Sequence, residues 1–193
     1  KAGQKPASQS FDGNIVPRIQ LALAQAQYDR AAELSRRLSV PAADASRLNM
    51  GQIANALLTA RVRVAAGQPA QALASVRGLR NDIEAGALAP YYRRFTASAN
   101  FIEGCVDLSR GNADAAIPLL QDALAEREKT LDADAPGIAE VQIALARSYS
   151  NAGDIAKARV LADAAAAIEN VHQELGPQYR RPLQNLQAKL AHH

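Results

Sequence analysis

Two side chains in this sequence of 193 residues are the main candidates for covalent chemistry, Cys105 and His172. A reactive cysteine needs a neighbouring base, and Cys105 follows Gly104 in an apolar helical pattern whose repeat unit has no histidine. His172 lies on a helical pattern near two glutamates and is interpreted as a surface histidine, while His192 and His193 are interpreted as the stub of an expression tag. Phosphate-loop, zinc-ligand and nucleophile-elbow spacings are absent. We therefore predict no enzymatic activity, no cofactor and no metal site.

A second chemical feature is a pair of similar basic segments, "PYYRRF" at 90–95 and "PQYRRP" at 177–182. Cations in the first turn of a helix oppose its dipole by about 0.3–1 kcal/mol each, so they need an acid or a ligand. One interpretation pairs them with an acid of the preceding loop, such as Asp132 or Glu174, and another makes them a surface for an acidic partner. The predicted basic patch consists of Tyr92, Arg93, Arg94, Tyr179, Arg180 and Arg181.

These segments and the isoelectric point near 9.2 also allow an alternative function, a nucleic-acid-associated regulatory domain. The balance of 22 basic against 19 acidic residues, interspersed along the chain, makes nucleic acid the weaker hypothesis.

The elements that would position these residues are marked by glycine and proline. The segments "AAGQPAQALASV" (65–76), "SRGNADAAIPLL" (109–120) and "NAGDIAKARVLA" (151–162) each place a glycine before a helix rich in small residues, and the glycines are 44 and 42 residues apart. Glycine ends helices and proline suits their first turn, so we expect one helical hairpin between successive prolines at 41, 90, 136 and 177.

Composition favours helices over sheets. The chain has 43 alanines, 4% aromatic residues and no tryptophan, and alanine favours helices and is depleted in strands. We predict an all-α fold of about seven to nine helices. Its expected parts are a linker or tail (1–13), a degenerate helical hairpin (14–40), three repeats (49–84, 91–131 and 135–174) and a C-terminal capping helix (178–190).

The repeating pattern resembles the tetratricopeptide repeat family, in its long-period variety found in kinesin light chains and bacterial proteins. The best match covers 126–179, where Leu145, Ala146 and Tyr149 resemble packing residues of a first helix. The turn and second helix are matched by Gly153, Ala158, Ala162 and Ala165. The resemblance, which extends over about 14–180, implies a right-handed superhelical solenoid of antiparallel helix pairs.

In that family the first helices of successive repeats line a concave groove that binds a peptide or helix. The resemblance places in this groove Leu57, Leu58, Arg61, Phe101, Ile102, Cys105, Ile143, Ala144, Arg147 and Asn151. An apolar groove with two arginines suits an amphipathic helix that carries acids. The chain's own tail or a second copy, giving a homodimer, would fit equally well.

We therefore expect a non-catalytic module for protein–protein interaction, part of a larger bacterial signalling, regulatory or assembly protein. No apolar run approaches the length of about 18 residues that a membrane span needs, so the chain is expected to be soluble. The choice between bacterial cytoplasm and periplasm stays open, because a single cysteine suits both.

Overall fold

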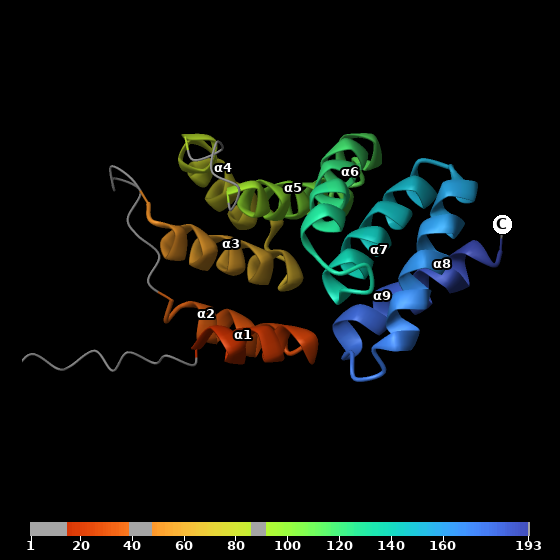
Figure 1. The fold of residues 1–193 in the computed structure, drawn as a ribbon, viewed down its shortest axis with the longest axis horizontal. Coiled ribbons are helices and arrows are strands. Elements are labelled where there is room, and N and C mark those ends of the chain that lie inside the picture. Colours follow the sequence, from red (N-terminus) through yellow and green to blue (C-terminus); the bar gives the residue numbers. More distant parts are fainter. Residues whose placement is uncertain (1–14, 39–47, 86–91, 193) are drawn as a thin grey trace, which may run out of the picture.

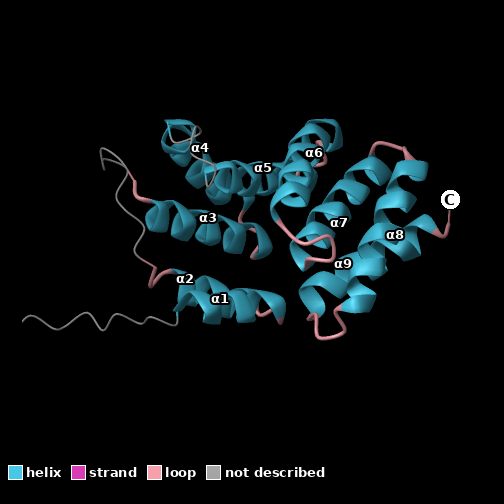
Figure 2. Ribbon diagram, viewed as in Figure 1, coloured by secondary structure: helices cyan, strands magenta, loops and turns pink. Residues whose placement is uncertain are grey.

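The computed structural model describes residues 15–38, 48–85 and 92–192, and every regular element in these ranges is a helix (Figures 1 and 2). The predicted all-α class is confirmed. The predicted linker at 1–13, Pro41 and Pro90 lie outside the described residues. The helices are α1 (Ile15–Ala24), α2 (Tyr28–Ser35), α3 (Met50–Ala65), α4 (Pro69–Ala85), α5 (Tyr92–Ser109), α6 (Ala113–Thr130), α7 (Pro136–Asn151), α8 (Ile155–Val171) and α9 (Pro177–Leu190).

Consecutive helices pack as hairpins, α1 with α2, α3 with α4, α5 with α6 and α7 with α8. The first helices of successive hairpins also touch, since α3 packs on α5 and α5 on α7. Helix α9 packs on both α7 and α8, where a capping helix was expected. The polypeptide thus passes from one hairpin to the next around an arc (Figure 1).

Left-handed residues form the turns inside the hairpins. Gly67, Gly111 and Gly153 have φ of 73°, 81° and 87°, the conformation that glycine adopts without strain. The residue after each glycine donates its N–H to a carbonyl five residues earlier, as in Asp154 to Tyr149 at 2.9 Å. Ala26 replaces glycine in the α1–α2 turn and still adopts φ 55°, which costs about 1–2 kcal/mol for a residue with a side chain.

Prolines and polar caps start the helices. Pro136 and Pro177 are the first residues of α7 and α9, as the spacing predicted, because their missing N–H has no partner in the first turn. Asn49 and Gln52 form a capping box before α3, and the Asp154 side chain accepts from the Lys157 N–H at the start of α8. These local signals fix where each helix begins.

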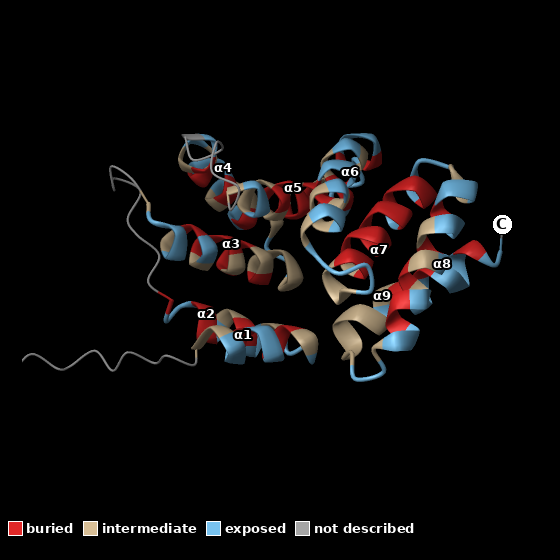
Figure 3. Cartoon of the chain, in the orientation of Figure 1, coloured by how far each residue is buried: buried red, intermediate tan, exposed pale blue. Residues whose placement is uncertain are grey.

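Small side chains let the helices of the core approach closely. Most residues of α7 are buried (Figure 3). Alanines on α4, α6 and α8, among them Ala72, Ala116 and Ala158, are fully buried. A close contact between α5 and α6 lies at Gly104, where an added Cβ would be 2.7 Å from Leu120 Cγ of α6. The small residues that follow each turn glycine in the sequence therefore lie in the core.

The arc brings the last helix back to the first. Helix α9 packs on α1, and a Cβ built on Gly176 would lie 2.1 Å from the Ala24 carbonyl oxygen at the end of α1. Only a residue without a side chain permits this approach, so Gly176 allows the N-terminal hairpin to rest on the start of α9.

Two helical glycines provide a matched test of the close packing. Gly104→Ala should lower the free energy of unfolding by about 1 kcal/mol, because overpacking against Leu120 outweighs the gain in helix propensity. Gly78→Ala, where a Cβ would meet nothing within 4 Å, should raise it by about 0.5–1 kcal/mol. Urea unfolding followed by circular dichroism measures both, and shifts of the same sign would contradict the close α5–α6 contact.

Candidate functional site

The ten residues of the predicted groove lie on α3, α5 and α7 and differ sharply in exposure. Five are buried: Leu57, Phe101, Ile102, Ile143 and Ala144. Three are partly buried: Leu58, Arg61 and Cys105. Two are exposed, Arg147 and Asn151, both near the C-terminal end of α7. Only this end of the predicted groove is well exposed to solvent.

The middle of the groove is occupied by an ion cluster centred on Glu140 of α7. Glu140 accepts hydrogen bonds from Arg61 Nη2 of α3 at 2.6 Å and from Arg127 Nη1 of α6 at 3.1 Å. Gln178 Nε2, in the first turn of α9, donates to the same carboxylate at 3.3 Å. The Arg127 guanidinium also lies over the Phe101 ring, 4.7 Å from its centroid. One carboxylate thus joins four helices.

The charges in this cluster stabilise one another. Burial alone would raise the pKa of Glu140, but the Arg61 and Arg127 guanidiniums outweigh burial and lower the pKa below its ordinary value of 4.5. Burial alone would lower the pKa of Arg61, but interactions led by the charge of Glu140 outweigh burial and raise it. Tyr179, predicted to belong to a basic patch, instead lies against Arg61.

The two candidates for covalent chemistry lie in different settings. Burial, with a smaller contribution from the Glu140 charge, raises the pKa of the Cys105 thiol to about 12, so the thiol stays protonated at neutral pH. His172 follows the last residue of α8, with Nδ1 3.0 Å from Glu174 Oε1, and this hydrogen bond raises the pKa of the imidazole. Metal-binding groups of three or more histidine, cysteine or acidic side chains are absent from the described ranges.

The two halves of the predicted basic patch have different roles. Arg93 and Arg94 are exposed at the start of α5. Arg180 instead binds the α8–α9 loop, donating from Nε to the Leu175 carbonyl at 2.9 Å and from Nη2 to the Gln173 carbonyl at 2.6 Å. Two backbone carbonyls of the loop therefore bind Arg180. One interpretation of the sequence had assigned this role to an acidic side chain.

Arg181 instead joins Arg147 and Asn151 in a pocket of about 430 Å³, which we call the α7–α9 pocket. The fold contributes Lys189 from α9 and Tyr28 from α2, neither of which was predicted for the site. Lys189 Nζ donates to Asn151 Oδ1 at 2.9 Å. Three cations meet here, and the lining has no carboxylate; it is formed by Tyr28, Arg147, Ser150, Asn151, Arg181, Pro182, Asn185, Leu186 and Lys189.

A buried hydroxyl in the lining has unused bonding capacity. Ser150 is only 7% exposed, and its Oγ has no hydrogen-bond partner among the described residues. Leaving a buried polar group unpaired costs about 1–3 kcal/mol. Arg147 and Arg181 likewise have no acidic partner within the described ranges. The α7–α9 pocket therefore offers positive charge to whatever enters it, while the Ser150 Oγ is covered by the surrounding protein.

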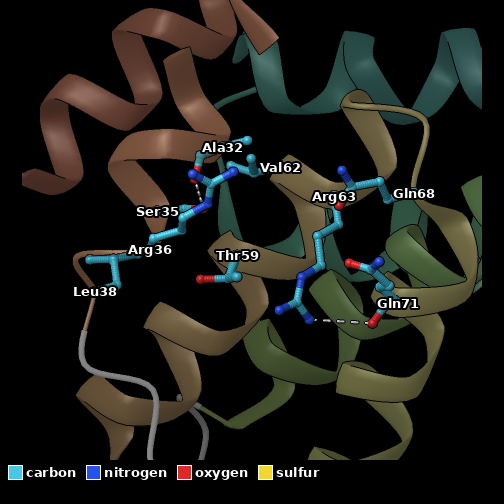
Figure 4. Close-up of a pocket in the computed structure, with 9 residues that line it drawn as sticks. All are labelled: Ala32, Ser35, Arg36, Leu38, Thr59, Val62, Arg63, Gln68 and Gln71. Carbon is cyan, nitrogen blue, oxygen red and sulfur yellow. Dashed lines mark hydrogen bonds between the residues drawn. The ribbon is translucent and has the colours of Figure 1, made fainter. Parts of the chain in front are cut away.

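A larger hollow of about 530 Å³ lies between α2, α3 and α4 (Figure 4). Its two arginines do not converge, because Arg36 lies beside Ala32 while Arg63 extends to the Gln71 carbonyl (Figure 4). Arg63 also donates to Ser75 Oγ. The Arg63 guanidinium is occupied by these hydrogen bonds, and the Arg36 guanidinium is directed elsewhere. This hollow is therefore the weaker candidate for a binding site.

Comparison of the chain with protein-family models, curated proteins and solved structures finds no match. None of the described helices is long and apolar enough to cross a membrane.

Arg61 and Arg147, predicted as equivalent groove arginines, should behave differently when replaced. Arg61→Ala should lower the free energy of unfolding by about 1.5–3 kcal/mol, because it removes a charged hydrogen bond from a carboxylate that is only 14% exposed. Arg147→Ala should change it by less than about 0.5 kcal/mol, as for an ordinary surface substitution. Urea unfolding of both variants checks this difference, and equal stabilities would exclude a structural role for the ion cluster.

The ion cluster also predicts how stability depends on pH. The folded chain keeps Glu140 ionised to a lower pH than the unfolded chain, so unfolding takes up a proton below about pH 4.5. The contribution of Glu140 is therefore fully present above that pH and is lost as the pH falls through the lowered pKa. Glu140→Gln should reduce the loss of stability between neutral pH and pH 3 to 4, whereas Glu128→Gln, at an exposed acid of α6, should retain it. Denaturant unfolding across this range would contradict the expectation if both variants matched the wild type.

Proposed function

We propose that this chain is a non-catalytic module for protein–protein interaction that binds an acidic segment of a partner in the α7–α9 pocket. It would belong to a larger bacterial signalling, regulatory or assembly protein and would be built as a right-handed tetratricopeptide-like superhelix. The superhelix is supported by the left-handed glycines 44 and 42 residues apart and by the packing of each hairpin's first helix on the next. The bacterial setting rests on the sequence resemblance alone.

The observation that carries the proposal is the gathering of three cations without an acid in one pocket. These cations are Arg147, Arg181 and Lys189. A guanidinium pairs well with a carboxylate, since two parallel N–H donors match two oxygens. The apolar edge formed by Pro182 and Leu186 would contact aliphatic side chains beside the acid.

Nucleic acid is the less supported ligand. A nucleic-acid surface needs several cations along an extended track, because affinity grows with the number of neutralised phosphates. Arg180 is occupied by loop carbonyls, which removes a cation from the predicted patch. Three cations around a pocket suit one or two carboxylates better than a phosphate backbone.

Peptides selected from a random display library against the wild-type chain should be enriched in aspartate and glutamate. Arg147→Glu or Arg181→Glu should weaken the selected peptides by about 10- to 100-fold, the loss expected for one charged hydrogen bond. Fluorescence anisotropy measures the affinities.

Arg110→Glu is the matched control, since Arg110 is an exposed arginine in the α5–α6 turn, outside the pocket lining. Its affinity should equal that of the wild type. Selection of peptides without acidic residues, or equal weakening by all three arginine variants, would reject the α7–α9 pocket as the binding site.

A further inference from the structure

Two separate hydrophobic cores meet at the α7–α9 pocket. The N-terminal hairpin, formed by α1 and α2, has its own core around Ile19 and Leu34, to which α3 contributes Val62. Helix α9 belongs instead to the main core, where Leu186 is buried. In the part of the chain that the structure describes, the core of the hairpin includes no side chain of α9. The pocket therefore lies at a boundary between two packing units.

Each of these units supplies part of the pocket wall. Arg147 lies on α7, and Arg181 and Leu186 lie on α9, whereas Tyr28 is the first residue of α2. The Tyr28 side chain is partly buried and packs on the core of the hairpin. The position of Tyr28 in the pocket is therefore set by where the hairpin rests.

The hairpin is made of the two shortest helices that the structure describes. Helices α1 and α2 have 10 and 8 residues, whereas the other described helices have 14 to 18. Helices this short are marginal without tertiary contacts. Ala26 takes a left-handed conformation in the turn, and Gln27 provides no side-chain cap for α2. Elements with few stabilising contacts open more readily than the rest of a fold.

The contact between Gly176 and Ala24 holds the hairpin at the pocket. Helix α2 packs on α3, and α1 packs on α9, where a Cβ on Gly176 would lie 2.1 Å from the Ala24 carbonyl oxygen. Ala24 ends α1, and Tyr28 begins α2 four residues later. The turn between them is tied to α1, because the Gln27 N–H donates to the Ala22 carbonyl at 2.8 Å. Tyr28 therefore moves with the end of α1.

A ligand that contacts both units stabilises their docking, because it binds the docked arrangement more tightly than the open one. We propose that the N-terminal hairpin is a movable wall of the α7–α9 pocket, so that binding of an acidic peptide and docking of the hairpin on α9 strengthen each other. This inference rests on the proposed function of the pocket. It makes Tyr28 a residue that contacts the peptide, and Gly176 a residue that positions Tyr28.

Gly176→Ala tests the coupling from outside the pocket lining. Gly176 has φ −77° and ψ 177°, which any residue adopts, so alanine is unfavourable there only through its contact with the end of α1. The variant should weaken the acidic peptide selected against the wild-type chain by about 3- to 10-fold in fluorescence anisotropy, because affinity falls with the docked fraction. Tyr28→Ala should weaken it similarly, and the double variant should lose no more than Tyr28→Ala alone. Gly78→Ala, where a Cβ meets nothing within 4 Å, is the matched control and should keep the wild-type affinity.

Hydrogen exchange of the wild-type chain measures the reverse effect and needs no variant. Helix α1 contributes no residue to the pocket lining, so the peptide reaches its amides only by holding the hairpin docked. The selected peptide at ten times its Kd should slow exchange of the α1 amides by up to about 10-fold. Amides of α4, which is also outside the lining, should exchange at an unchanged rate.

The outcomes separate this inference from the proposed function. If Arg147→Glu weakens the peptide but Gly176→Ala and Tyr28→Ala do not, the hairpin is a passive neighbour and the inference is overturned, while the proposed function stands. Equal exchange of α1 with and without peptide would have the same meaning. Additive losses from Gly176→Ala and Tyr28→Ala would show that Gly176 acts through α9 alone, against the inference. If Arg147→Glu also has no effect, the pocket itself is rejected and the inference with it.

Discussion

The contact on which the rest of the structure depends is the carboxylate of Glu140 held between Arg61 and Arg127. These residues come from α7, α3 and α6, and Gln178 adds α9. Interfaces made of alanine provide little side-chain shape to fix how one helix is placed along another. A largely buried carboxylate has few satisfactory positions, since leaving it unpaired is costly. The cluster therefore selects one relative placement of helices that alanine packing alone would permit in several.

The same cluster divides the predicted groove into two parts with different properties. Around Arg61 the groove is filled, because its charges are paired within the chain and Tyr179 lies against them. Around Arg147 the groove is open, because α9 approaches with Arg181 and Lys189 and brings no acid. Arg61 and Arg147 occupy matching positions of two repeats, but α9 places different residues beside each of them. Internal charge pairing limits where an external ligand could bind.

The sequence predicted what local signals encode and missed what depends on distant contacts. Turn glycines, the prolines that begin α7 and α9 and the buried alanines were all readable, because each acts within a few residues. Glu140 had a signal that could have been used, since it is the only acid in a helix that is otherwise apolar and polar-neutral apart from Arg147. No local sequence signal predicted that Tyr28, Ser150 and Lys189 would come together at the α7–α9 pocket. Their proximity depends on the curvature accumulated over several helix pairs, and α9 was expected to act only as a cap.

The contact between Gly176 and Ala24 makes the order of assembly matter. In a linear stack of helix pairs each unit depends only on its neighbours, so the two ends form and fray independently. Here the carbonyl that closes α1 meets a residue about 150 positions later, and the entropy lost in closing so long a loop is recovered only when every pair between them is in place. During synthesis α1 and α2 are made before α9, and they can pack on α3 before the contact with α9 forms. The contact between α1 and α9 thus couples the first and last of the described helices.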